Sequence, residues 1–133
     1  SHQVGNQVLC DVARCLRENI REVDLLSRFG GDEFVVLLPE TEVKFAALLG
    51  EQLRAAVEAM HVITEHGALG VTVSIGVAGV RDEMQSIADL IEDANRAEHA
   101  AKQHGRNRVA IIDVNGADAP AHSYSGMVIG VGR

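Results

Sequence analysis

Residues 25–39 read Leu-Leu-Ser-Arg-Phe-Gly-Gly-Asp-Glu-Phe-Val-Val-Leu-Leu-Pro, the most informative stretch of the sequence. Two short apolar runs, 25–29 and 34–38, flank the turn residues 30–33. Apolar runs on either side of a glycine-rich turn predict a β-hairpin. We expect Pro39 to end the second strand, because proline cannot donate a ladder hydrogen bond.

Helical patterns surround this hairpin. Apolar side chains recur at helical spacing in residues 4–21, 41–60 and 86–104, where Thr41 and Ser86 are suitable N-caps. Residues 71–79 alternate between β-branched and small side chains, which predicts a strand with another layer close over its small face. A last short strand is expected at 108–112 and a minor strand and turn within 61–70. Helices interleaved with a hairpin and single strands favour an α+β fold, a sheet flanked by helices.

Composition narrows the class of protein. The chain has 133 residues, which suits one domain, and a net charge of −7. With 3% aromatic residues and excess acid, it lacks the basic, stacking surface that a nucleic-acid polymer needs. No apolar run approaches the roughly 18–20 residues that cross a bilayer. The two cysteines, Cys10 and Cys15, suggest no disulfide framework, so a reduced cytoplasmic setting is expected.

The hairpin turn is the first candidate site. Gly30 and Gly31 leave room for a bulky ligand, and the adjacent Asp32 and Glu33 point to opposite faces. One of these carboxylates could bind a hard cation such as Mg²⁺. The alternative is a polar turn whose acids discourage pairing at a sheet edge.

Two further pairs of charged residues are candidates. Lys102 and Arg106, four residues apart, could clamp a triphosphate, or could simply complement the C-terminus of the third helix. Arg21 and Asp24 could hold a guanine nucleotide, or could form an exposed ion pair of little energetic consequence.

The complete set of motifs resembles the GGDEF domain of diguanylate cyclases, whose signature stands at residues 30–34. The similarity covers residues 1 to about 112, which we expect to form the domain, with 113–133 as a tail or linker. The other matching segments are Ser1-His2 with Val4–Leu9, Leu37–Thr41, Val71–Ala78 and Ala101–Val109.

The resemblance implies a ferredoxin-like, palm-type nucleotidyl cyclase fold with a mostly antiparallel central sheet. It implies the condensation of two GTP into cyclic di-GMP and two pyrophosphates across a homodimer, with Mg²⁺ or Mn²⁺. It also implies a role for each matching residue. Asp32 would be catalytic and bind metal with Glu33 beside it, Gly30, Gly31, Asn6, Lys102 and Arg106 would bind substrate, and Arg21 and Asp24 would form an inhibitory product site.

The chain also departs from the family pattern. The family's first strand, which carries a second metal-binding Asp, would precede the pair Ser1-His2. Asn6 stands where the family usually has an Asp that accepts hydrogen bonds from guanine. An amide side chain offers only one acceptor atom. Asn95 and His99 likewise replace a usual Asp and Tyr. The lost strand could be replaced by a strand of another copy or by the tail, where the run Met127-Val128-Ile129 is apolar enough to be a candidate.

These departures predict a GGDEF domain that turns over GTP weakly or not at all. The alternative is a degenerate module that binds cyclic di-GMP or GTP as a sensor, and a third possibility is a domain that only dimerises or regulates a neighbour. Other domains of a longer parent protein, which could be membrane-anchored, are expected partners, and nucleic-acid polymers are not.

Overall fold

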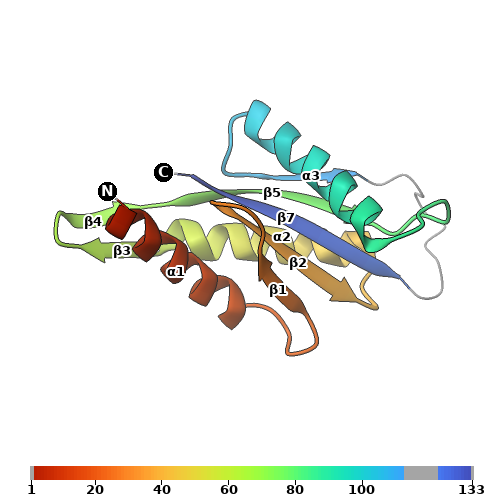
Figure 1. The fold of residues 1–133 in the computed structure, drawn as a ribbon, viewed down its shortest axis with the longest axis horizontal. Helices are drawn as coiled ribbons and strands as arrows, with labels where there is room; N and C mark the ends of the chain where they lie inside the picture. Colours follow the sequence, from red (N-terminus) through yellow and green to blue (C-terminus); the bar gives the residue numbers. More distant parts are fainter. Residues whose placement is uncertain (1, 113–122, 133) are drawn as a thin grey trace.

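The computed structural model describes residues 2–112 and 123–132, which fold as a five-stranded sheet with helices on both faces and a separate small hairpin (Figure 1). The elements are α1 (His2–Glu18), β1 (Leu25–Arg28), β2 (Glu33–Pro39), α2 (Val43–Ala59), β3 (His61–Thr64), β4 (Gly67–Gly70), β5 (Thr72–Gly79), α3 (Ile87–Gln103), β6 (Val109–Ile112) and β7 (Tyr124–Gly132).

The main sheet has the strand order β1-β2-β7-β5-β6. All neighbouring strands are antiparallel except β5 and β6, which are parallel. The expected hairpin is present as β1 and β2, and the α+β class with a mostly antiparallel sheet is confirmed. Strands β3 and β4 form the second, two-stranded sheet, where a minor strand and turn were expected.

Strand β7 lies in the centre of the main sheet, between β2 and β5 (Figure 1). Val128 is paired with Val35 on one side and with Gly76 on the other. The expectation of a tail or linker at 113–133 is therefore wrong for 124–132, while residues 113–122 and 133 lie outside the described part of the chain. The apolar run 127–129 lies within this strand.

Two features of the β7 sequence explain why its pattern did not predict a strand. A central strand is covered on both faces, so its side chains need not alternate between apolar and polar. Its glycines resemble those of a linker, yet two of them lie where a side chain has little room. A Cβ on Gly126 would lie 3.3 Å from Leu90, and a Cβ on Gly130 would overlap the carboxylate of Glu98.

The larger part of the core lies between the sheet and the helices α1 and α2. The i,i+4 row of α1 and the inward side chains of α2 meet one face of β2, β5 and β7. The buried members include Val8, Val12, Leu16, Leu53, Val57, Val36, Ile75 and Ile129.

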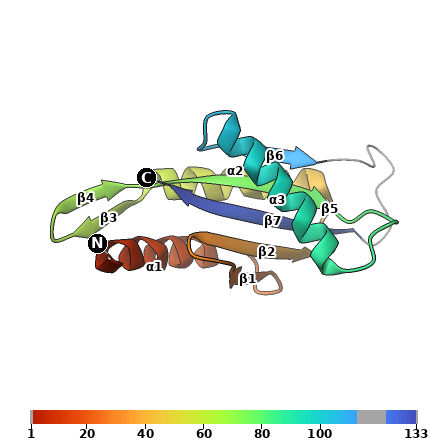
Figure 2. The same ribbon diagram turned by 45° about the horizontal axis from the view of Figure 1, so that its top comes forward.

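Helix α3 covers the opposite face of the sheet, as Figure 2 shows. A Cβ added to Gly76 would overlap the backbone of α3 at Ala94 and Glu98. The helix therefore lies directly on β5, and the predicted layer over the small face of 71–79 is confirmed.

The expected helix caps differ from those observed. The N-cap of α2 is Glu42 rather than Thr41, whose hydroxyl donates instead to the carbonyl of Pro39 at 2.9 Å. Ser86 is the N-cap residue of α3 but makes no capping hydrogen bond through its side chain. None of the helices in the described ranges is long and apolar enough to cross a membrane.

Candidate functional site

The hairpin turn is held in place by its own backbone and by β7. Gly30 has φ of +85°, a conformation that glycine adopts readily. The amide of Phe29 donates to the carbonyl of Glu33 at 2.7 Å, and the amide of Val131 donates to the carbonyl of Asp32 at 2.9 Å. The turn is thus fixed against the C-terminal end of β7, which positions both carboxylates of the turn there.

A cleft of about 160 Å³ opens beside Asp32, on the side of the sheet that α1 covers. Asn6, in the first part of α1, is exposed and follows the lining residue Gly5 in the chain. The lining residues are Gly5, Val8, Leu9, Asp32, Val131 and Gly132. The fold therefore brings the start of α1, the hairpin and the end of β7 together around one hollow.

Glu33 faces α3 on the other side of the sheet. It is paired with Gly130 in the ladder and lies near Glu98 and Lys102. Burial raises the pKa of the Glu33 carboxyl, the negative charges of Glu98 and Asp32 raise it further, and Lys102 and His99 oppose the rise. Ionised Glu33 is therefore disfavoured in this cluster.

We expect Glu33→Gln to remove a pH-dependent loss of stability. The raised pKa means that folded Glu33 holds its proton at pH values where the unfolded chain has released it. Its contribution to stability is complete below the ordinary glutamate pKa of about 4.3 and is lost as pH rises through the raised value. Urea unfolding of both proteins from about pH 4 to 7 should show the variant gaining stability relative to the wild type. A difference in the free energy of unfolding that does not change with pH would contradict the raised pKa of Glu33.

Lys102 and Arg106 lie near the same end of β7, at the end of α3 and just beyond it. Lys102 Nζ is 2.9 Å from Oε2 of Glu98. Arg106 has φ of +64°, and its Nη1 would lie 3.8 Å from a Cβ on Gly132. The fold thus gathers the predicted acids and the predicted phosphate-binding cations at one end of the sheet.

Sequence reasoning missed Glu98, which is fully buried within the small-residue stripe of α3. Its position between Ala97 and Ala101 was a usable signal, because an acid at a core position of a helix requires a partner. The residue four positions on, Lys102, is that partner.

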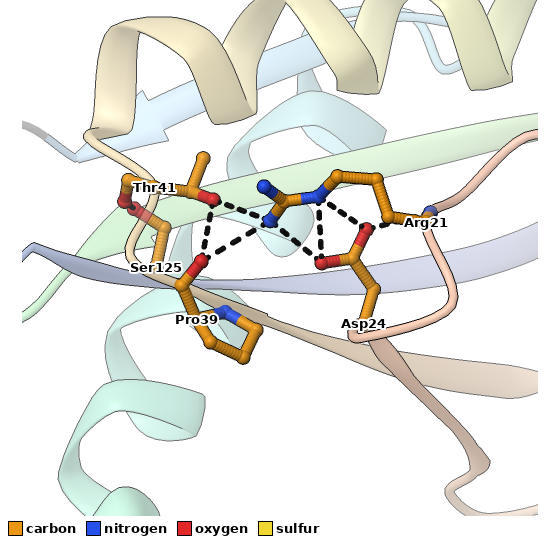
Figure 3. Close-up of polar contacts among 5 residues, drawn as sticks. All are labelled: Arg21, Asp24, Pro39, Thr41 and Ser125. Carbon is orange, nitrogen blue, oxygen red and sulfur yellow. Dashed lines mark hydrogen bonds and ion pairs between the residues drawn. The ribbon is translucent and has the colours of Figure 1, made fainter.

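Arg21 and Asp24 lie at the opposite end of β2, roughly 20 Å of strand away from the hairpin turn. The Asp24 side chain is fully buried and accepts from the backbone amide, Nε and Nη2 of Arg21. Nη2 also donates to the carbonyl of Pro39 and to the hydroxyl of Thr41, as Figure 3 shows.

This network extends to β7. The hydroxyl of Ser125 donates to the carbonyl of Thr41 at 2.7 Å (Figure 3). Arg21 therefore joins the turn after α1 to the end of β2 and, through Thr41, to the start of β7. Arg21 and Asp24 therefore form a partly buried network and not the exposed ion pair that their spacing also permitted.

The acids of the site do not form a metal centre. Among residues 2–112 and 123–132, no group of three His, Cys, Asp or Glu side chains is arranged to hold a metal ion. Strand β7 presents Gly130 beside Glu33 and ends at Gly132, so it adds no carboxylate to the hairpin. The residues present do not fit a protein-built site for Mg²⁺ or Mn²⁺, which needs anchoring charge.

The chain is similar in sequence to proteins named as diguanylate cyclases. "Diguanylate cyclase A" of Treponema denticola is 34% identical over 114 residues, 86% of this chain and 31% of that protein. "Diguanylate cyclase DgcM" of Escherichia coli K12 is 42% identical over 108 residues, 81% of this chain and 25% of that protein. The chain thus spans about a third or less of the length of these relatives.

Solved structures give the same result. The GGDEF domain of YfiN from Pseudomonas aeruginosa has a TM-score of 0.77 at 31% identity, covering 86% of this chain and 71% of that one. The active GGEEF domain of a diguanylate cyclase from Vibrio cholerae has a TM-score of 0.72 at 29% identity, covering 85% and 71%. The family model described as "Diguanylate cyclase, GGDEF domain" matches residues 1–108. The chain belongs to the GGDEF family.

Proposed function

We propose that the chain is a diguanylate cyclase-type domain that binds GTP at the hairpin end of the sheet and converts it to cyclic di-GMP weakly or not at all. The cleft beside Asp32 and Asn6 would receive the nucleotide, and Gly30 and Gly31 would allow its close approach. Lys102 and Arg106 would bind the β- and γ-phosphates. The convergence of these residues at one end of the sheet supports this placement.

The observation that carries the proposal of weak turnover is the place of Gly130. It lies opposite Glu33, where the central strand meets the hairpin, and it has no side chain to offer a metal. The catalytic roles of Asp32 and Glu33 would then depend on further acids, which residues 2–112 and 123–132 do not place beside them.

Membership of the GGDEF family supports a proposal for the pathway and the cellular location. We propose a role in bacterial cyclic di-GMP signalling, within a cytoplasmic part of a longer protein that carries other domains. Condensation of two GTP would require two copies of the domain facing each other, because each copy holds one nucleotide. A homodimer is therefore part of the proposal for any residual activity.

We expect the chain to bind GTP and to form only trace cyclic di-GMP. Calorimetry with GTP should show binding that Arg106→Ala weakens about tenfold, because a charge-assisted contact to phosphate is lost. Lys44→Ala is the control, since Lys44 is an exposed cation of α2. Chromatography after incubation with GTP and Mg²⁺ or Mn²⁺ measures turnover. Robust product would contradict weak turnover, and equal GTP affinity in wild type and Arg106→Ala would contradict the phosphate site.

The second candidate is a sensor of cyclic di-GMP at the inhibitory product site proposed for Arg21 and Asp24. The side chain of Arg21 is 53% exposed despite its network, so a ligand could still reach it. Calorimetry with cyclic di-GMP separates the candidates. Binding that Arg21→Lys weakens, with no measurable binding of GTP, would favour the sensor.

A further inference from the structure

Glu98 of α3 is a buried acid to which the proposed function gives no role. Its side chain is fully buried under β7, and within the described residues neither carboxylate oxygen accepts an aligned hydrogen bond. The carboxylate fits there because residue 130 is glycine, since a Cβ on Gly130 would overlap Oε2 and lie 3.0 Å from Cε of Lys102.

The ammonium of Lys102 is the charge that compensates this buried carboxylate. Nζ lies 2.9 Å from Oε2, and the Lys102 side chain is 27% exposed, so it joins the buried acid to the surface. An ionised carboxylate in the interior is costly unless it is paired, and breaking such a pair by removing one partner is strongly destabilising. Lys102 is therefore held by Glu98 more firmly than an exposed i,i+4 pair would hold it.

We infer that Glu98 is an internal competitor for Lys102, and that it lowers the affinity of this end of the sheet for polyphosphates. This inference rests on the proposed function. A phosphate that drew Lys102 away would leave Glu98 buried without a partner. A phosphate that approached without displacing it would meet an ammonium already neutralised by a carboxylate.

The neighbouring acids also disfavour the binding of a polyphosphate. Glu33 lies close enough to Glu98 for the two carboxylates to repel each other, and Asp32 adds to that repulsion. Glu33, whenever it is ionised, adds to the negative charge of Asp32 and Glu98 at the end of the sheet that holds Lys102 and Arg106. Removing the charge of Glu98 therefore lowers the negative charge that a polyphosphate meets there.

The experiment compares wild type with Glu98→Gln and Glu98→Leu. Calorimetry measures affinity for GTP and for inorganic tripolyphosphate, which carries the charge without the base. Glu92→Gln removes one charge from an exposed position of the same helix and is the matched control. A fourth variant, Glu98→Gln with Lys102→Met, tests whether any gain passes through Lys102. Thermal unfolding establishes which variants fold, and Glu98→Gln keeps the shape of the side chain should Glu98→Leu fail.

We expect both single variants at Glu98 to bind GTP and tripolyphosphate about tenfold more tightly, because a charge-assisted contact becomes available. The control and the double variant should show no gain. Equal GTP affinity in wild type and Glu98→Gln overturns the inference and leaves the proposed function standing. A gain for tripolyphosphate with no binding of GTP in any protein supports the inference and overturns the proposed function. Absence of binding to either ligand in every protein overturns both.

Discussion

Ile129→Ala is expected to lower the free energy of unfolding by about 2–5 kcal/mol, the range for truncating a fully buried aliphatic side chain. Ile129 is 0% exposed and lies in β7 between Phe34 of β2 and Ile75 of β5. The loss would be a large share of the stability of a domain of this size, which is about 5–15 kcal/mol. Urea unfolding followed by circular dichroism measures it.

The control for this prediction is the same substitution in an edge strand. Ile111 of β6 is 49% exposed, so Ile111→Ala should cost less than about 1 kcal/mol. Equal effects of the two substitutions would mean that β7 does not occupy the centre of the sheet in solution. A cost confined to Ile129 would establish that 124–132 belong to the domain.

Arg21→Ala is expected to lower the free energy of unfolding by about 2–3 kcal/mol, although Arg21 is half exposed. The substitution leaves the buried carboxylate of Asp24 with the backbone amide of residue 21 as its remaining partner in this network. It also removes the donor to Pro39 and Thr41 (Figure 3). Urea unfolding at neutral pH measures the loss.

Arg14→Ala provides a matched control, because Arg14 forms an i,i+3 ion pair with Asp11 at 3.5 Å on the surface. Its expected cost is within about 0.5 kcal/mol. Similar small costs for both variants would show that the Arg21 network does not stabilise the fold. If Arg21→Ala strongly lowers the free energy of unfolding, a loss of cyclic di-GMP binding in that variant must be compared with binding by the charge-conserving Arg21→Lys.

Much of this fold could be predicted from local sequence patterns. The period of 3.6 in the three helices, the glycine-rich turn at 30–31 and the alternation in 71–79 report local geometry, which each segment specifies by itself. The motifs of the hairpin and of 101–109 then identified the family, which the family model confirmed over residues 1–108. The candidate site residues came from the same motifs, and their roles remain predictions.

Sequence alone determined that the chain contains a GGDEF hairpin, three amphipathic helices and a strand with a small face. Only the tertiary structure decided that 124–132 form the central strand, because a segment buried on both faces carries no alternation and its glycines resemble those of a linker. Only the tertiary structure placed Arg21 in a network with the start of β7. It also placed Glu98 under Gly130, although the i,i+4 spacing of Glu98 and Lys102 could have been noticed in the sequence. These contacts join residues up to about a hundred positions apart, and their energies depend on burial, which no local pattern records.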